Sequence, residues 1–200
     1  MLNEICRYFI CFMIFSFIGW VYESVFYSVQ LKRFVNSGFL YGCICPIYGL
    51  GGLVLVPFAS VTDDFRVIFL AGAVICSMLE YAISWLLENL FDARWWDYSD
   101  WPMNINGRIC IVSVVGFGLA SIIGTQVIIP AVLGTVCAIG EEQLRSIAVF
   151  FMIVLAIDVY YTVKNMNREE NTPWFVEEHS QFVEKHINEW SRKFKEFIRK

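Results

Sequence analysis

Five long apolar runs constrain this chain more than any other feature of its sequence. They occupy roughly residues 5–28, 39–61, 65–90, 109–133 and 146–163. A bilayer core about 30 Å thick needs roughly 20 mostly apolar residues in helical form. Backbone groups in lipid must form hydrogen bonds within their own segment, so helices are the expected form. The sequence therefore predicts an all-α integral membrane protein with about five transmembrane helices.

The composition fits this class and excludes several others. The 200 residues are 58% hydrophobic and 17% charged, whereas soluble domains are nearer half apolar and a quarter charged. No basic patch with interleaved aromatic residues occurs, so nucleic acid is not an expected partner. The seven cysteines are scattered, mostly in apolar runs, which favours small buried side chains. We expect no metal and no cofactor, and a first run that is retained as a span.

The chain divides into a transmembrane domain, residues 1–170, and a tail, residues 171–200. In the tail, apolar side chains recur every seven residues and charged ones fill the other face. The seven-residue series is Val176, Val183, Trp190 and Phe197. This pattern predicts an amphipathic helix that lies on the cytoplasmic leaflet. Pairing with another helix, or docking on a partner, are the alternatives.

Basic residues in the connections predict the orientation. Lys32, Arg33, Arg94 and Arg108 lie in the first and third connections, and Lys164 and Arg168 follow the last span. The other side carries Arg7, Arg66 and Arg145. Because short cytoplasmic connections carry an excess of Lys and Arg, we expect an outside N-terminus and a cytoplasmic C-terminus in a cell membrane.

Two spans have unusual contents of small residues. The second holds Gly42, Pro46, Gly49, Gly51, Gly52 and Pro57. This density predicts a broken or re-entrant segment, with a kinked packing helix as the alternative. In the fourth span, Gly116, Ala120 and Gly124 share one helical face, a pattern typical of close helix packing.

Four acidic residues fall inside apolar runs, where insertion of an ionisable side chain costs roughly 2.5–3.5 kcal/mol each. They are Glu23, Glu80, Glu88 and Asp158. Serine residues share their helical faces, as expected where helices meet around something polar. The alternative is a purely structural interhelical bond, for which Glu80 with Arg108 is the obvious pair.

Topology places most of these groups toward one membrane face. Glu23 precedes the first connection, and Glu88 precedes the third, residues 91–108. The third connection is rich in tryptophan, which suits the headgroup zone, and in specific polar groups. We therefore predict that it caps a polar, solute-binding cavity that opens to the cytoplasm. The candidate site residues are Glu23, Asn36, Tyr48, Glu80, Trp96, Asp97, Asn104 and Arg108.

Several runs, in order, resemble the motifs of one known family. They are residues 19–23 (GWVYE), 36–42 (NSGFLYG), 45–49 (CPIYG), 79–81 (LEY), 96–99 (WDYS) and 104–108 (NINGR). The family is that of the bacterial putative ABC-transporter type IV membrane proteins, and the resemblance covers about residues 15–113. The family usually has Gly-Pro where this chain has Gly42-Cys43, and a basic residue at the position of Ser37. The resemblance implies a transport role.

Three functions are compatible with these observations. The first is a permease or transporter component for a small solute. Because the chain has no G-x-x-x-x-G-K-[ST] loop, any ATPase would be a separate subunit. The second is a sensor or scaffold that acts through the tail helix. The third is a membrane-embedded enzyme acting on lipid phosphates, in which paired carboxylates do acid–base work and Arg108 holds phosphate.

Overall fold

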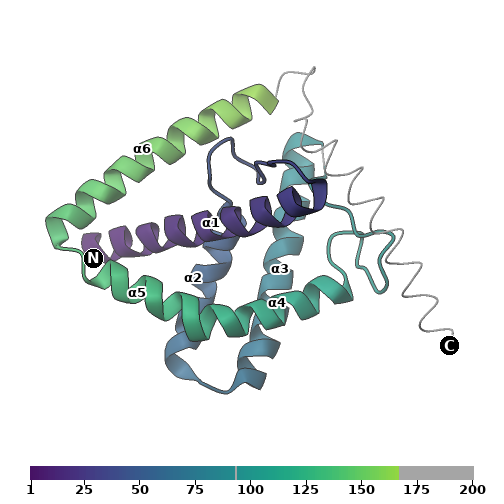
Figure 1. Cartoon of the computed structure of the whole chain (residues 1–200), viewed down its shortest axis with the longest axis horizontal. Coiled ribbons are helices and arrows are strands. Elements are labelled where there is room, and N and C mark those ends of the chain that lie inside the picture. Colours follow the sequence, from purple (N-terminus) through teal and green to yellow (C-terminus); the bar gives the residue numbers. More distant parts are fainter. Residues whose placement is uncertain (93, 167–200) are drawn as a thin grey trace.

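The computed structural model describes residues 1–92 and 94–166, and these residues are built almost entirely from helices. The predicted tail helix lies outside the described residues. In chain order the helices are α1 (Leu2–Leu31), α2 (Pro46–Val61), α3 (Phe65–Phe91), α4 (Ile111–Ile123), α5 (Ile129–Cys137) and α6 (Glu141–Met166) (Figure 1). A π-helical turn, Gly124–Ile128, joins α4 to α5 without a break.

Four of the described helical segments are long and apolar enough to cross a bilayer. They are Leu2–Leu31, Phe65–Phe91, Ile111–Cys137 and Glu141–Asn165. The fifth apolar helix, Pro46–Val61, has 16 residues, which is about 24 Å at 1.5 Å per residue. The prediction of an all-α, multi-pass membrane protein is therefore confirmed.

The second predicted span differs from the helix observed. We expected it to start near residue 39, but α2 begins at Pro46 and residues 32–45 form a loop. This loop folds back on α1, where the Cys45 amide donates to the Ser16 carbonyl at 3.0 Å. The backbone of Gly38 has a φ of 115°, which glycine adopts readily. This non-helical segment is partly buried, at Val35, Ser37, Leu40, Ile44 and Cys45, and its polar groups find partners in the protein.

Glycines explain how tightly the helices approach. A side chain at Gly49 or Gly52 of α2 would collide with α1, and one at Gly19 of α1 would collide with Tyr48. The same holds between α3 and α4, where Gly72 lies against Ser121. Part of the glycine content of the second span therefore serves close helix packing.

The small-residue face predicted for the fourth span is not used within the described part of the chain. Gly116 and Ala120 are exposed, and no atom lies within 4 Å of a side chain built at Gly116 or Gly124. Instead, Gly118 packs on Phe69 and Ser121 packs on Gly72. The helix is rotated so that this second small-residue face meets α3.

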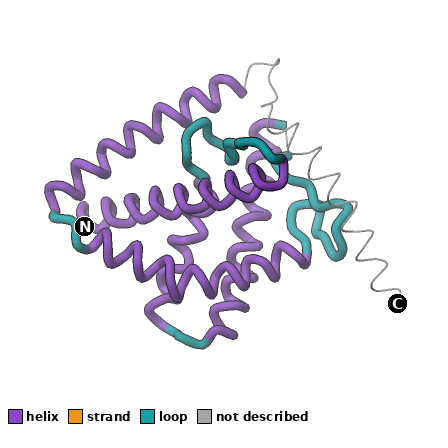
Figure 2. The backbone as a smooth tube through the Cα atoms, viewed as in Figure 1, coloured by secondary structure: helices purple, strands orange, loops and turns teal. Residues whose placement is uncertain are grey.

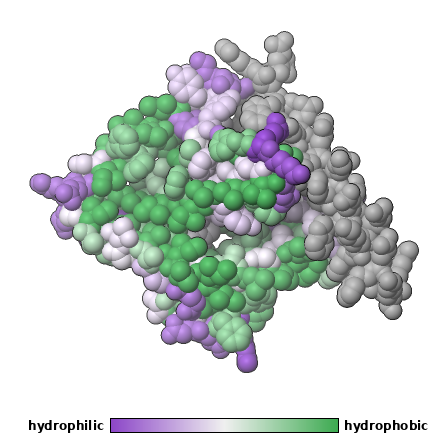
Figure 3. Space-filling model, in the orientation of Figure 1, coloured by the Kyte–Doolittle hydropathy of each residue, from purple (hydrophilic) through white to green (hydrophobic). Residues whose placement is uncertain are grey.

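The two long connections gather where α1 and α3 end (Figure 2). Phe39 of the first connection packs on Phe91 and on Trp95, with ring centroids 5.7 and 5.5 Å apart. A further apolar core lies where α1, α2, α5 and α6 meet, centred on Phe15, Ile129 and Leu144. The visible surface is mostly apolar and is hollowed near its centre, between α1 and α4 (Figure 3). The polar residues near the two connections are therefore the candidate site.

Candidate functional site

Glu23 of α1 is surrounded by hydrogen-bond donors from the first connection and α2. Its Oε2 accepts from Ser37 Oγ at 2.8 Å and from Cys45 Sγ at 3.6 Å. Its Oε1 accepts from Tyr48 Oη at 3.1 Å. Every one of these donors is uncharged. Two of the predicted site residues, Glu23 and Tyr48, are thus in direct contact.

The first connection is held in place by further polar contacts. Asn36 accepts from Trp20 Nε1 at 2.6 Å and donates to the Tyr41 carbonyl at 2.8 Å. The Gly42 amide donates to Asp158 of α6 at 3.0 Å. Asn36 and Asp158 therefore fix the loop that carries Ser37 and Cys45, and they do not contact Glu23 themselves.

The two carboxylate oxygens of Glu80, on α3, differ in their hydrogen bonds, and Ser113 also interacts with this side chain. Its Oε1 accepts from Tyr98 Oη at 3.2 Å, while the buried Oε2 has no hydrogen-bond partner. The hydroxyl of Ser77, one turn earlier, is also buried without a partner. Burial and the neighbouring carboxylate raise the pKa of Tyr98 well above its usual value. The Tyr98 hydroxyl therefore stays a donor across the physiological range.

Tyr27 links the surroundings of the two carboxylates. It interacts electrostatically with both Glu23 and Glu80, and the two glutamates also interact with each other. Tyr27 lies one turn beyond Glu23 on α1. We call the group of Glu23, Tyr27, Tyr48, Glu80 and Tyr98 the inner cluster.

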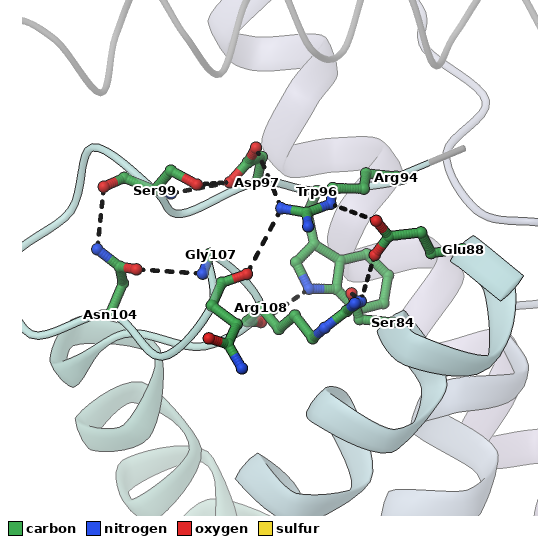
Figure 4. A network of polar contacts seen from close by, with 10 residues as sticks. Ser84, Glu88, Arg94, Trp96, Asp97, Ser99, Asn104, Gly107 and Arg108 are labelled. Carbon is green, nitrogen blue, oxygen red and sulfur yellow. Dashed lines mark hydrogen bonds and ion pairs between the residues drawn. The ribbon is translucent and has the colours of Figure 1, made fainter. Parts of the chain in front are cut away.

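A second cluster, at the end of α3, is made of ion pairs (Figure 4). Arg108 lies 2.6 Å from Glu88 Oε2 and donates to Ser84 Oγ at 3.3 Å. Arg94 Nε lies 3.0 Å from Glu88 Oε1, and its NH1 lies 3.6 Å from Asp97. We call Glu88, Arg94, Asp97 and Arg108 the outer cluster. The predicted pair of Glu80 with Arg108 is wrong, because Arg108 reaches Glu88, two turns nearer the helix end.

The third connection uses most of its polar groups to fold itself. Trp96 Nε1 donates to the Arg108 carbonyl at 3.1 Å, and Asp97 accepts from the Ser99 amide at 2.9 Å. Asn104 donates to the Ser99 carbonyl at 2.9 Å and accepts from the Gly107 amide at 3.1 Å (Figure 4). These bonds position Tyr98 and Arg108 against α3. The role of Trp96, Asp97 and Asn104 in solute binding stays a prediction.

The structure thus divides the eight predicted site residues. Glu23, Tyr48 and Glu80 belong to the inner cluster, Asp97 and Arg108 to the outer one, and Asn36, Trp96 and Asn104 to the loops that support them. Sequence reasoning did not select Ser37, Cys45, Tyr27 or Tyr98. The available signal was that Tyr27 shares a helical face with Glu23, and that the other three lie inside the motif runs.

Comparison with known proteins gives one match. The model of the family described as Putative ABC-transporter type IV matches residues 10–163. No curated protein and no solved structure matched the chain. The matched region includes both long connections and every residue of the inner and outer clusters. Since the match spans most of its length, the chain belongs to the Putative ABC-transporter type IV family of membrane proteins.

Proposed function

We propose that this chain is the membrane-embedded component of a transporter, and that the inner cluster binds a small solute. One observation carries the proposal. Within the described residues, neither Glu23 nor Glu80 forms an ion pair with a basic side chain, although Arg94 and Arg108 are close in the fold. Uncompensated carboxylates inside a helical bundle are costly, and they mark solute or ion pathways in membrane proteins.

The orientation is part of this proposal. The basic residues of the first and third connections favour a cytoplasmic position for that end of the bundle. The site would then open toward the cytoplasm beneath the third connection, whose tryptophans suit the headgroup zone. An ATPase subunit, which the family description suggests, would contact this end of the bundle. The chain itself has no phosphate-binding loop of the ATPase type.

The alternative of a lipid-phosphate enzyme gains no support from the position of Arg108. Its NH1 already contacts Glu88 and Ser84. A sensor role for the tail concerns residues outside the described part of the chain.

The test uses the variants Glu23→Gln and Glu80→Gln in cells in which removal of the gene for this chain changes the concentration of an intracellular solute. Intracellular solutes are profiled in cells without the gene, and in cells that express the wild type or a variant at matched membrane levels. We expect at least one solute to change when the gene is removed, to be restored by the wild type, and not to be restored by either variant.

A matched control removes one acidic charge elsewhere. Asp63 is exposed in the turn between α2 and α3, and Asp63→Asn is expected to restore the solute pool as the wild type does. If both glutamine variants are inserted normally and restore every pool, the inner cluster is not the transport site.

A further inference from the structure

The charge balance of the inner cluster indicates what kind of ligand it takes. Two carboxylates from α1 and α3 interact with each other. The groups that reach them are all neutral: Ser37, Cys45, Tyr48, Tyr98 and Ser113. Two buried negative charges in mutual range repel each other, and they need a cation or protons to offset that repulsion.

Buried oxygen atoms without hydrogen-bond partners are a second, independent indication of a ligand. Glu80 and Ser77 are only 7% and 5% exposed, yet Glu80 Oε2 and Ser77 Oγ have no hydrogen-bond partner. Buried polar atoms are nearly always satisfied, so such exceptions require an explanation. The two residues are three positions apart on α3 and therefore lie on one face of that helix. A ligand with N–H donors would satisfy both.

The aromatic residues narrow the choice of cation. Tyr27, Tyr48 and Tyr98 contribute to the same cluster, and aromatic rings attract organic ammonium groups. A divalent metal would need more ligands, and no group of three or more His, Cys, Asp or Glu side chains suited to a metal occurs among the described residues. A protonated amine needs only a few acceptors and an apolar surround.

We infer that the inner cluster binds a small organic cation, a protonated amine whose N–H groups donate to Glu80 Oε2 and Ser77 Oγ while its charge is balanced by Glu80 and Glu23. This inference deepens the proposed function and rests on it. The amine's carbon substituent would lie against the tyrosine rings.

The experiment measures binding directly, with the purified full-length protein in detergent. The melting temperature is recorded against rising butylammonium chloride at constant ionic strength. Sodium chloride serves as the charge control, and 1-butanol at equal concentration controls for the apolar group. Because a ligand of the native state stabilises it, we expect a concentration-dependent rise of about 2 °C or more with butylammonium and none with either control.

Variants then locate the site. Glu80→Gln is expected to weaken the apparent Kd for butylammonium at least about tenfold, since it removes a charge-assisted hydrogen bond. Ser77→Ala, a milder change that serves if the first variant folds poorly, should weaken it about threefold. Asp63→Asn should bind as the wild type does. An equal rise in all variants, or a melting temperature that responds to pH and not to the amine, overturns the inference.

Binding and transport can fail separately. If butylammonium binds at Glu80 but is not moved by the protein in reconstituted vesicles or cells, the inference stands and the transport proposal fails. If Glu80→Gln abolishes a solute phenotype while no amine binds to the wild type, transport stands and the inference is overturned.

Discussion

The inner and outer clusters lie toward the same end of the helical bundle, and their carboxylates are neutralised in different ways. Glu88 of the outer cluster has two guanidinium groups within 3.0 Å, those of Arg94 and Arg108. Glu80 lies two turns earlier on the same helix and meets only the neutral hydroxyls of Tyr98 and Ser113. The carboxylates of the outer cluster therefore have basic partners, while those of the inner cluster have only neutral ones.

This difference separates two kinds of polar group that look identical in the sequence. A carboxylate with its own counter-ions joins segments of the protein, and here it fastens the third connection to α3. A carboxylate with only neutral donors costs stability, and the fold retains it where a ligand or a proton is handled. Four predictions about substitutions in the two clusters test this interpretation.

The largest effect is expected for Arg108→Ala. The side chain of Arg108 is 11% exposed and contacts both Glu88 and Ser84. Removing it leaves a carboxylate without its closest partner and frees the third connection from α3. We expect the melting temperature in detergent to fall by about 5 °C or more. Arg108→Lys should recover part of the loss, because a lysine keeps the charge but not the planar fork. Full stability of Arg108→Ala would contradict the fastening role.

The same substitution at two positions of α3 should have opposite consequences. Glu88→Gln leaves Arg94 and Arg108 without their shared counter-ion, so we expect the melting temperature to fall by about 3 °C. Glu80→Gln removes a charge that has no counter-ion, and should leave the melting temperature within about 1 °C of the wild type or raise it. Equal losses at both positions would mean that the two clusters do not differ in charge balance.

Tyr98→Phe removes the hydroxyl that donates to Glu80 Oε1 and should cost about 1 kcal/mol at neutral pH. It also carries a pH signature. Folding raises the pKa of Tyr98, so the unfolded chain ionises first, and this residue lowers stability as pH rises above about 10. The decline between pH 9 and 11, followed by chemical denaturation, should be shallower in the variant. Parallel curves would show that Tyr98 is not buried against Glu80.

The smallest effect is expected for Arg94→Ala. Its side chain is 35% exposed, and its bonds to Glu88 and Asp97 compete with water and salt. We expect the melting temperature to change by less than about 2 °C, and the difference to vanish near 1 M salt. If Arg94→Ala lowers the melting temperature as much as Arg108→Ala does, the exposed fraction of an arginine side chain does not determine how much its ion pairs contribute to stability.

Much of the architecture follows from the sequence because apolar length is a local property. Runs such as residues 65–90 can satisfy their backbone in lipid only as helices, and α3 (Phe65–Phe91) matches that run closely. The number of membrane crossings between the first and third connections also places both on the same membrane face. The contacts of Phe39 with Phe91 and Trp95 agree with this prediction.

Two predictions were wrong, the packing face of the fourth span and the partner of Arg108. Both depend on the rotation and register of one helix against another. Gly116, Ala120 and Gly124 form as good a packing face as the one around Gly118, and only the contacts of Phe69 and Gly72 select between them. Likewise, nothing local to Glu80 or Glu88 tells which one Arg108 will reach. Small differences in helix rotation and loop path decide such pairings.

By itself, the sequence determined that this protein is a bundle of membrane helices with carboxylates in its apolar runs. Hydrophobic length and the cost of unsatisfied backbone in lipid are sufficient for that conclusion. The tertiary structure alone decided which carboxylates have counter-ions. It placed Arg94 and Arg108 on Glu88 and left Glu23 and Glu80 with neutral donors. Ion pairing depends on separations of a few ångströms between segments far apart in the chain, and spacing along the sequence does not encode those separations.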